Sequence, residues 1–405
     1  MSGLRLIVAA FGDAGHAFPA IGLARALSRR GHEVVVETWE RWREPVEAEG
    51  IEFAAAEEYV TFPPPVPGSQ DGASVADAAL ALVPYLEERR FDVVVSDILT
   101  LAPALAAERA GLRRATLIPH VYPVHEPGMP FFAFGAMPPR TPIGRGLWRA
   151  ALPVLVGGLR RGRTEMNESR AAVGLPPIDR LHGGISQELA LVATFPQLEY
   201  PRRWPHGVRV TGPIGFELPD PDVELPAGDG PLVVVAPSTA QDPDCRLIRV
   251  AFEALADEPV RVLATTNRHR PDPPLPAPPA NAVLVDWLSY SQAMAAADLV
   301  ICHGGHGTVA RALGAGAPAL CCPAVGDMAE NGARVAWAGA GQMLPWRLLG
   351  ARPLRASVRR ILGDASFRAR AGEIAAWARS SDGAGRAAVL VEELATSASR
   401  ALGRD

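Results

Sequence analysis

The sequence predicts an α/β protein of two doubly wound domains, each with a parallel sheet covered by helices on both faces. The chain has 405 residues, more than one hydrophobic core ordinarily holds, so two domains are expected. Short β-rich apolar runs alternate with helical stretches in the first half, and the same alternation starts again near residue 231. Between the halves, residues 200–230 are rich in proline and glycine without sustained periodicity, which is typical of an interdomain connection.

The first half contains clearly marked elements. An amphipathic stretch at Ala20–Arg30, closed by Gly31, predicts a helix. Short runs rich in β-branched residues predict strands. These strand candidates are Leu4–Ala10, Glu33–Thr38, Asp92–Ser96 and Ala115–Ile118.

Two further stretches of the first half interrupt this alternation. Pro123–Pro142 contains three phenylalanines and two methionines, and it predicts either a mobile apolar flap that lines a binding site or an excursion packed on the first sheet. Leu147–Gly158 is apolar but interrupted by Arg149 and Pro153. We interpret it as a packed helix, with membrane contact as the alternative.

The second half predicts a separate domain. Its strand candidates again alternate with helical stretches, so the whole chain divides into an N-terminal domain at residues 1–210, a linker at 211–230 and a C-terminal domain at 231–383. The strand candidates are Leu232–Ala236, Val260–Thr265, Ala282–Val285, Leu299–Cys302 and Ala319–Cys322.

Composition excludes several classes of protein. The formal net charge is −4 with both signs mixed, which does not favour a nucleic-acid-binding surface. The first residues resemble a strand more than a signal peptide, and no apolar run is long enough to span a bilayer, so we expect a cytoplasmic protein. The cysteines lack zinc-like spacing and are expected to stay reduced; they are Cys245, Cys302, Cys321 and Cys322.

The stretch His303-Gly-Gly-His-Gly-Thr308 is the strongest functional signal in the second half. It lies between an expected strand ending at Cys302 and an expected helix at Val309–Gly316. A strand, a glycine turn and a helix in this order direct free backbone N–H groups at one point, where a diphosphate can bind. The alternative is a glycine-rich packing turn in which Thr308 caps the helix.

The first half has a comparable turn at Phe11–Pro19, between its first strand and first helix. His16 in this turn and Asp97 at the end of a later strand are both expected at the carboxyl edge of the sheet, where open α/β sheets bind ligands. If the two strands are close, Asp97 can hold one imidazole nitrogen while the other accepts a proton from a substrate. A structural histidine and a capping aspartate are the alternatives.

Spaced motifs in both halves resemble a known family. The first half has Gly15-His16-x-x-Pro19 and Arg30-Gly31-His32. The second half has His303-Gly-Gly-x-Gly-Thr308, Ala312-Leu313-x-x-Gly316-x-Pro318, Pro323, Asp327, Asn331, Arg334-Val335 and Gly339-Ala-Gly341. This pattern is similar to the family 1 glycosyltransferases of the GT-B fold, in particular to bacterial enzymes that glycosylate antibiotics and other secondary metabolites. The resemblance covers nearly the whole chain and implies two Rossmann-like domains facing a central cleft, with a terminal helix at about 384–405 packed back on the first.

The resemblance also implies a mechanism. His16 matches the general base of the family and Asp97 its orienting partner, for an inverting transfer that needs no metal and no cofactor besides the nucleotide-sugar co-substrate. Asp242-Pro243-Asp244 is the only string like a metal-binding DxD, and we assign it no metal because its proline equally suits the start of a helix.

A larger set of residues matches the donor site of the family. Trp287 resembles the residue that packs on the nucleotide base, unless it is a core tryptophan, and the backbone near Leu288 would bond the base edge. Ser238 and Thr239 would face the donor phosphates, or else cap the next helix. Asp327 would bind hydroxyls of the sugar. The remaining donor residues, at the diphosphate turn, are His303, Gly305, His306, Gly307 and Thr308.

One residue departs from the family pattern. Many relatives have glutamine after the acidic residue, whereas this chain has Met328, which supplies no amide donor. A TDP- or UDP-linked deoxysugar, with fewer hydroxyls to bond, is one explanation; a replacement of the amide by Glu330 or by backbone is another.

The acceptor and the class of reaction stay open at this level. Apolar and aromatic residues predict a cleft for a small, largely apolar natural product, lined by His120, Phe131, Phe132 and Phe134, with His125 nearby. Attack by an aromatic carbon, which gives a C-glycoside, is an alternative to O-glycosylation. A non-catalytic nucleotide-sugar-binding partner and an epimerase are the other classes. The protein is expected to be a monomer or homodimer.

Overall fold

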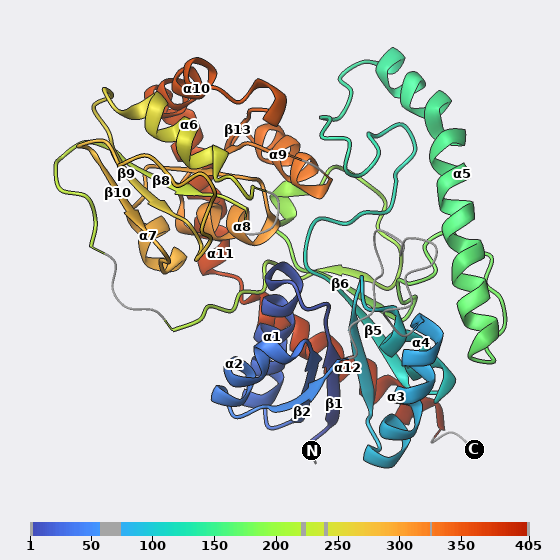
Figure 1. The fold of residues 1–405 in the computed structure, drawn as a ribbon. Helices are drawn as coiled ribbons and strands as arrows, with labels where there is room; N and C mark the ends of the chain where they lie inside the picture. Colours follow the sequence, from blue (N-terminus) through green and yellow to red (C-terminus); the bar gives the residue numbers. More distant parts are fainter. Residues whose placement is uncertain (1–2, 57–73, 220–223, 239–241, 325, 403–405) are drawn as a thin grey trace.

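The computed structural model of the chain describes residues 3–56, 74–219, 224–238, 242–324 and 326–402. The chain folds into two α/β domains, each with a parallel sheet, which confirms the predicted fold class (Figure 1). The first sheet has the strand order β3-β2-β1-β4-β5-β6-β7, and the second has the order β10-β9-β8-β11-β12-β13. Neighbouring strands run parallel in both sheets.

The first sheet and its helices come mainly from the first half of the chain. The strands are β1 (Arg5–Ala9), β2 (Glu33–Thr38), β3 (Glu52–Ala55), β4 (Val93–Asp97), β5 (Arg113–Ile118), β6 (Leu189–Val192) and β7 (Val208–Val210). The helices are α1 (Ala14–Arg29), α2 (Arg43–Ala48), α3 (Val75–Arg89), α4 (Leu101–Arg109) and α5 (Pro142–Ala172), with short 3-10 turns η1 (Glu40–Trp42) and η2 (Pro196–Leu198).

The second sheet begins at Leu232. Its strands are β8 (Leu232–Ala236), β9 (Arg261–Thr265), β10 (Ala282–Val285), β11 (Leu299–Cys302), β12 (Ala319–Cys321) and β13 (Gly341–Met343). The helices of this half are α6 (Arg246–Leu255), α7 (Tyr290–Ala296), α8 (His306–Ala315), α9 (Asp327–Trp337), α10 (Ala351–Gly363), α11 (Ala365–Arg379) and α12 (Gly383–Leu402), with η3 at Trp346–Leu348.

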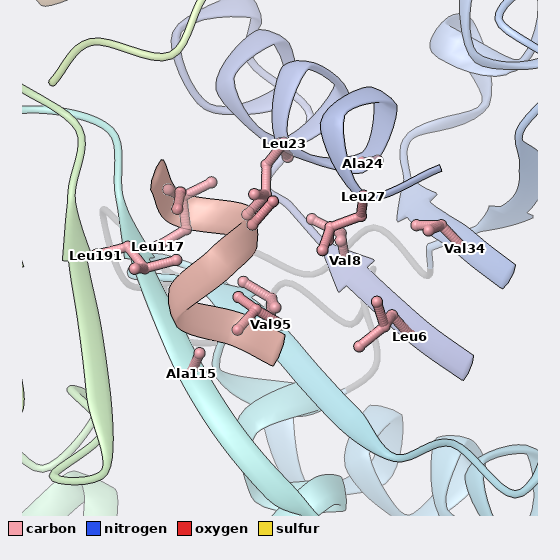
Figure 2. Packing of buried hydrophobic residues seen from close by; sticks show 14 of the residues in the cluster. Leu6, Val8, Leu23, Ala24, Leu27, Val34, Val95, Ala115, Leu117 and Leu191 are labelled. Atoms are coloured by element: carbon pink, nitrogen blue, oxygen red, sulfur yellow. The ribbon is translucent and has the colours of Figure 1, made fainter. Parts of the chain in front are cut away.

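The alternation of side chains along β1 explains why the first sheet is covered on both faces. Leu6 and Val8 point into the cluster formed with α1 and α12, whereas Ile7 points into the cluster formed with α3 and α4. Figure 2 shows the first cluster, in which Leu23 and Leu27 of α1 lie over the sheet. Strands buried on both faces have continuous apolar sequences, which is the pattern that predicted them.

The terminal helix α12 returns to the first sheet (Figure 1). Its Glu392 accepts hydrogen bonds from the Arg30 guanidinium at 2.6 and 2.8 Å, and the Nε2 atom of His32 lies 2.7 Å from the same carboxylate. The hydrogen bond from Arg30 lowers the pKa of Glu392 to about 2, against its partial burial. The Arg30-Gly31-His32 motif therefore attaches the end of the chain to the first domain.

Several elements differ from the sequence-based expectations. The predicted strands did not include β3, β6, β7 or β13, each of which has three or four residues. The predicted packed helix at 147–158 is part of the longer α5, and none of those twelve residues is buried. Among the described residues, no helix is both long and apolar enough to cross a membrane.

Candidate active site

His16 and Asp97 meet because β1 and β4 are neighbours in the sheet. His16 lies in the first turn of α1, directly after β1, and Asp97 is the last residue of β4. The His16 Nδ1 atom is 2.8 Å from Asp97 Oδ2, and the other carboxylate oxygen accepts the backbone N–H of Leu99 at 2.9 Å. The Asp97 side chain is fully buried, whereas the His16 side chain is 18 % exposed. The carboxylate is thus held on both sides, and Nε2 of His16 is left for a substrate.

Opposing effects act on the His16 imidazole. Burial is the largest single effect and lowers the pKa, but the charge and hydrogen bond of Asp97, with the charges of Asp327 and Asp13, together raise the pKa above its ordinary value. Because Asp97 accepts the hydrogen on Nδ1, the neutral ring carries its lone pair on Nε2. This arrangement makes His16 a stronger base than a free histidine.

The glycine turn of the second domain lies at the carboxyl end of β11. Gly305 is the N-cap of α8, and no side chain caps this helix, so the capping role considered for Thr308 is not seen. A Cβ at Gly305 would collide with the His303 ring, and one at Gly304, where φ is +89°, would lie 2.8 Å from the Met328 carbonyl oxygen. The turn can therefore approach a ligand closely only with glycine at these positions.

Both histidines of the turn are neutral at physiological pH. Burial lowers the pKa of His303, whose Nδ1 lies 3.4 Å from the Ala236 carbonyl oxygen. Burial, with a smaller contribution from His120, lowers the pKa of His306 to about 4. The Nε2 of His306 lies 3.2 Å from the carbonyl oxygen of Ala193, in the first domain. His306 therefore joins the two domains as well as bordering the turn.

A cavity of about 280 Å³ lies between the two edges. It is lined from the first domain by Gly15 and Phe18 and from the linker by Glu217 and Leu218. Seven of the predicted donor residues line it, namely Trp287, Leu288, His303, Gly305, His306, Gly307 and Thr308. The structure thus brings the motif residues of the second domain together around one space, opposite the turn that carries His16.

Some lining residues were not indicated by the sequence. Four polar side chains border the cavity without belonging to a recognised motif: Glu217, Asn267, Tyr290 and Arg311. Only Arg311 had a detectable signal, because it follows Gly307 by one helical turn on α8 and so shares its face. The other three come from separate segments that meet only in the folded chain.

Trp287 is half-buried rather than part of the core. The Arg268 guanidinium lies 4.6 Å from the centre of its ring, and the indole N–H has no partner among the described residues. A ring that lines the cavity and is already stacked on one side suits a flat ligand on the other.

Ser238 is buried just beyond β8, and Thr239 lies outside the described residues. At the start of α6, the Asp242 carboxylate accepts the backbone N–H groups of Arg246 and Leu247 at 2.8 and 3.0 Å. The first aspartate of Asp242-Pro-Asp244 therefore serves the start of this helix.

Asp327 and Met328 begin α9, beside the glycine turn. The charge of Asp327 helps to raise the pKa of His16 and opposes the larger effect of burial, which lowers the pKa values of His120 and His303. The Met328 backbone packs against Gly304. The Asn331 side chain donates a hydrogen bond to the Gly304 carbonyl at 2.9 Å. The first turn of α9 therefore braces the glycine turn.

The predicted acceptor residues fall into two groups. His120 lies beside His16, with ring centres 6.2 Å apart, and its other neighbour Phe132 stacks on it at 5.5 Å. Phe131 and Phe134 instead pack against Trp148 of α5, at 5.1 and 6.0 Å. Phe131 is buried there and Phe134 is exposed, so neither ring is brought to His16.

The segment 123–142 is held against the second domain as well as the first. The Tyr200 hydroxyl donates to the Ala136 carbonyl at 3.1 Å, and Gly135 packs closely against Ala329 of α9. Neither a free flap nor an excursion confined to the first sheet describes it; the segment bridges the two domains beside His16 and His120.

Two parallel α/β domains whose active edges face each other across a cavity define a GT-B glycosyltransferase. Comparison with known proteins supports this class. Residues 251–389 match the model of the erythromycin biosynthesis protein CIII-like C-terminal domain, and residues 20–157 match that of glycosyltransferase family 4.

Full-length relatives identify the family. The chain is 30 % identical to 4'-demethylrebeccamycin synthase of Lentzea aerocolonigenes, over 92 % of this chain and 95 % of that protein. It is 29 % identical to O-mycaminosyltylonolide 6-deoxyallosyltransferase of Streptomyces fradiae, over 97 % and 98 % of the two chains. The chain therefore belongs to the GT-B glycosyltransferase family that includes bacterial antibiotic glycosyltransferases.

Solved structures share the fold over the whole chain. The glycotransferase of kitacinnamycin superposes with a TM-score of 0.76 at 21 % identity, covering 97 % of this chain and 100 % of that one. Glycosyltransferase VinC, solved in complex with dTDP, has a TM-score of 0.69 at 18 % identity, with coverage of 97 % and 100 %.

Proposed function

We propose that this glycosyltransferase transfers a sugar, with inversion, from a nucleoside diphosphate donor to a hydroxyl of a small, largely apolar natural product. His16 acts as the general base, no metal takes part, and the reaction takes place in the cytoplasm. The observation that carries the proposal is the His16–Asp97 pair, 2.8 Å apart, in the turn whose Gly15 lines the cavity.

The proposed transfer uses groups from the carboxyl edges of both sheets. The acceptor O–H gives its proton to Nε2 of His16, and its oxygen attacks the anomeric carbon from the face opposite the diphosphate. The bond from that carbon to the phosphate oxygen breaks, and the nucleoside diphosphate leaves with the electron pair. Asp97 stabilises the imidazolium, and the uncapped start of α8 stabilises the charge that develops on the leaving group.

For the donor, we propose a thymidine or uridine diphosphate sugar, most simply a deoxysugar. Met328 offers no amide to bond a hydroxyl, and the relative from Streptomyces fradiae is named for a deoxysugar. VinC, which has the same fold, was solved in complex with dTDP. Turnover of nucleotide-linked deoxysugars and nucleotide-linked glucose should be compared by mass spectrometry; a clear preference for glucose would reject the deoxysugar.

The role of His16 is tested by His16→Ala in the same assay. Loss of the base is expected to lower kcat by about a hundredfold or more, while donor affinity, measured by calorimetry, stays within about twofold. Near-normal transfer by this variant would remove His16 from the role. A product formed from the donor alone would indicate an epimerase, and donor binding without turnover on any acceptor would indicate a binding protein.

A further inference from the structure

Helix α5 carries the most exposed large apolar side chains among the described residues. Ile143, Leu147 and Val154 are 77 %, 67 % and 80 % exposed. At about 100° per residue they fall on one stripe of the helix about 40° wide. We call these three residues the α5 apolar stripe. Figure 1 shows α5 as a long helix along one side of the molecule, and Arg170 is its only buried residue.

The segment around the stripe is strongly basic. No acidic residue occurs between Glu126 and Glu165, although the whole chain has a formal net charge of −4. Ten residues without charge, 150–159, separate two groups of arginines. The six arginines of this interval are Arg140, Arg145, Arg149, Arg160, Arg161 and Arg163.

An occupant of this surface must be apolar and negatively charged. Arg161 lies on the stripe, so two copies of α5 packed through the stripe would bring two cations into one interface, which disfavours a symmetric dimer through this helix. A protein groove would cover the stripe alone, whereas Arg145, Arg149 and Arg160 lie about 120° to 180° around the helix from it. The interface of an anionic bilayer offers acyl chains to the stripe and phosphate groups to arginines that reach along the other sides of the helix.

We propose that α5 docks the enzyme on an anionic lipid surface, lying in the interface without crossing it. The apolar stripe enters the boundary of headgroups and acyl chains, while Arg161 on the stripe and the arginines on the other sides of the helix bind lipid phosphates. The proposal stands on exposure and charge alone and does not depend on the sugar transferred.

Helix α5 lies near the predicted acceptor residues. The link between docking and the acceptor rests on the proposed function. Trp148 of α5 contacts Phe131 and Phe134, and Phe132, which lies in the same segment, stacks on His120 beside His16. A docked enzyme would turn the acceptor side of its site toward the lipid in which an apolar acceptor dissolves.

Sedimentation of the full-length protein with vesicles tests the docking. Vesicles of phosphatidylcholine with phosphatidylglycerol are expected to bind the protein at low salt and to release it as salt increases, while vesicles of phosphatidylcholine alone bind at least tenfold less. Leu147→Asp with Val154→Asp is expected to abolish binding. The matched control Leu80→Asp with Leu348→Asp changes two exposed leucines elsewhere by the same charge and should bind as the wild type does.

The arginines are tested in the same way. Arg149→Gln with Arg160→Gln should weaken binding by roughly tenfold or more. Arg352→Gln with Arg360→Gln, two exposed arginines of α10, should leave it unchanged. Absence of binding to anionic vesicles, equal loss in the control variants, or a dimer in light scattering that the α5 variants dissociate would each overturn the proposal. Transfer to a water-soluble acceptor is expected to be unchanged in all four variants, so a failure of docking is distinguishable from a failure of the proposed reaction.

Discussion

The two sheet edges both place a histidine after a parallel strand and beside the start of a helix, yet they tune it in opposite directions. His16 has a buried carboxylate on Nδ1 and a raised pKa. His303 has only a backbone carbonyl near its Nδ1, and burial lowers its pKa. The same position in the fold thus holds a histidine of raised pKa on one side and one of lowered pKa on the other, and the partner of Nδ1 decides which.

His16 and His303 can act on one bound donor only while the two sheet edges face each other. A buried ion cluster joins the domains: Arg334 of α9 contacts Glu330 at 2.8 Å and Glu199 of the first domain at 3.0 Å, and its guanidinium lies 4.1 Å from the Tyr200 ring. Glu199 also accepts the backbone N–H of Tyr122 at 2.6 Å. Burial raises the pKa of Glu330, and Arg334 opposes this rise.

Breaking this junction is expected to have the largest effect. Arg334→Met leaves Glu199 and Glu330 buried without their cation and should lower the free energy of unfolding by about 3 to 5 kcal/mol. Denaturant unfolding followed by circular dichroism measures it. The control is Arg161→Ala, which breaks the exposed pair with Glu165 and should cost less than about 1 kcal/mol. Equal losses in the two variants would mean that the cluster does not stabilise the junction.

Removing the carboxylate beside His16 is expected to make the environment of its imidazole resemble that of His303. Asp97→Asn replaces the carboxylate on Nδ1 by an amide, so the pKa of His16 should fall below its ordinary value, because burial then dominates. We expect kcat to fall by about a hundredfold or more. NMR titration of the imidazole and steady-state kinetics measure the two effects. Asp13→Asn removes only a minor charge from an exposed side chain and is the control, with an expected change of less than threefold.

The glycine turn offers a smaller change at the second edge. Gly305→Ala keeps a helical-start backbone but places a methyl group against the His303 ring. The ring or the turn must shift, and donor affinity should fall by roughly tenfold. Gly314→Ala in the same helix is the matched control, because its Cβ would meet Phe195 at 3.7 Å, an ordinary contact. Calorimetry with the nucleotide sugar compares them; unchanged affinity in Gly305→Ala would show that the donor does not use the turn.

Elements marked by neighbouring residues could be predicted from the sequence, whereas contacts between distant segments could not. Short β-rich apolar runs predicted β1, β4 and β8, and the edge argument placed His16 and Asp97 at one edge of the sheet, because parallel strands end at a common edge. The cluster around Arg334 could not be predicted, because its members come from distant segments whose contacts exist only after the domains pack. The same holds for Glu217, which the linker brings to the cavity.

The burial of α5 was predicted wrongly for a related reason. Its apolar sequence resembles that of a core helix, and the sequence alone cannot tell a core from a surface for external contact. His306 is the intermediate case. Its motif placed it at the turn, where it does line the cavity, but its hydrogen bond to Ala193 in the other domain had no local signal.

The smallest expected effect comes from pH alone, in the unmodified protein. The raised pKa of His16 means that the neutral, basic form is lost as pH falls through a value above 6.5, so kcat should decline by several-fold between pH 8 and pH 6.5. Donor affinity should change by less than about twofold over this range, because His303 and His306 have lowered pKa values and stay neutral. The nucleotide sugar keeps a constant charge there. If kcat and donor affinity declined together, His16 and His303 would titrate over the same pH range, and the proposed difference between the two edges would be wrong. A decline in kcat alone, abolished in Asp97→Asn down to pH 6.5, would assign the difference to the carboxylate on Nδ1.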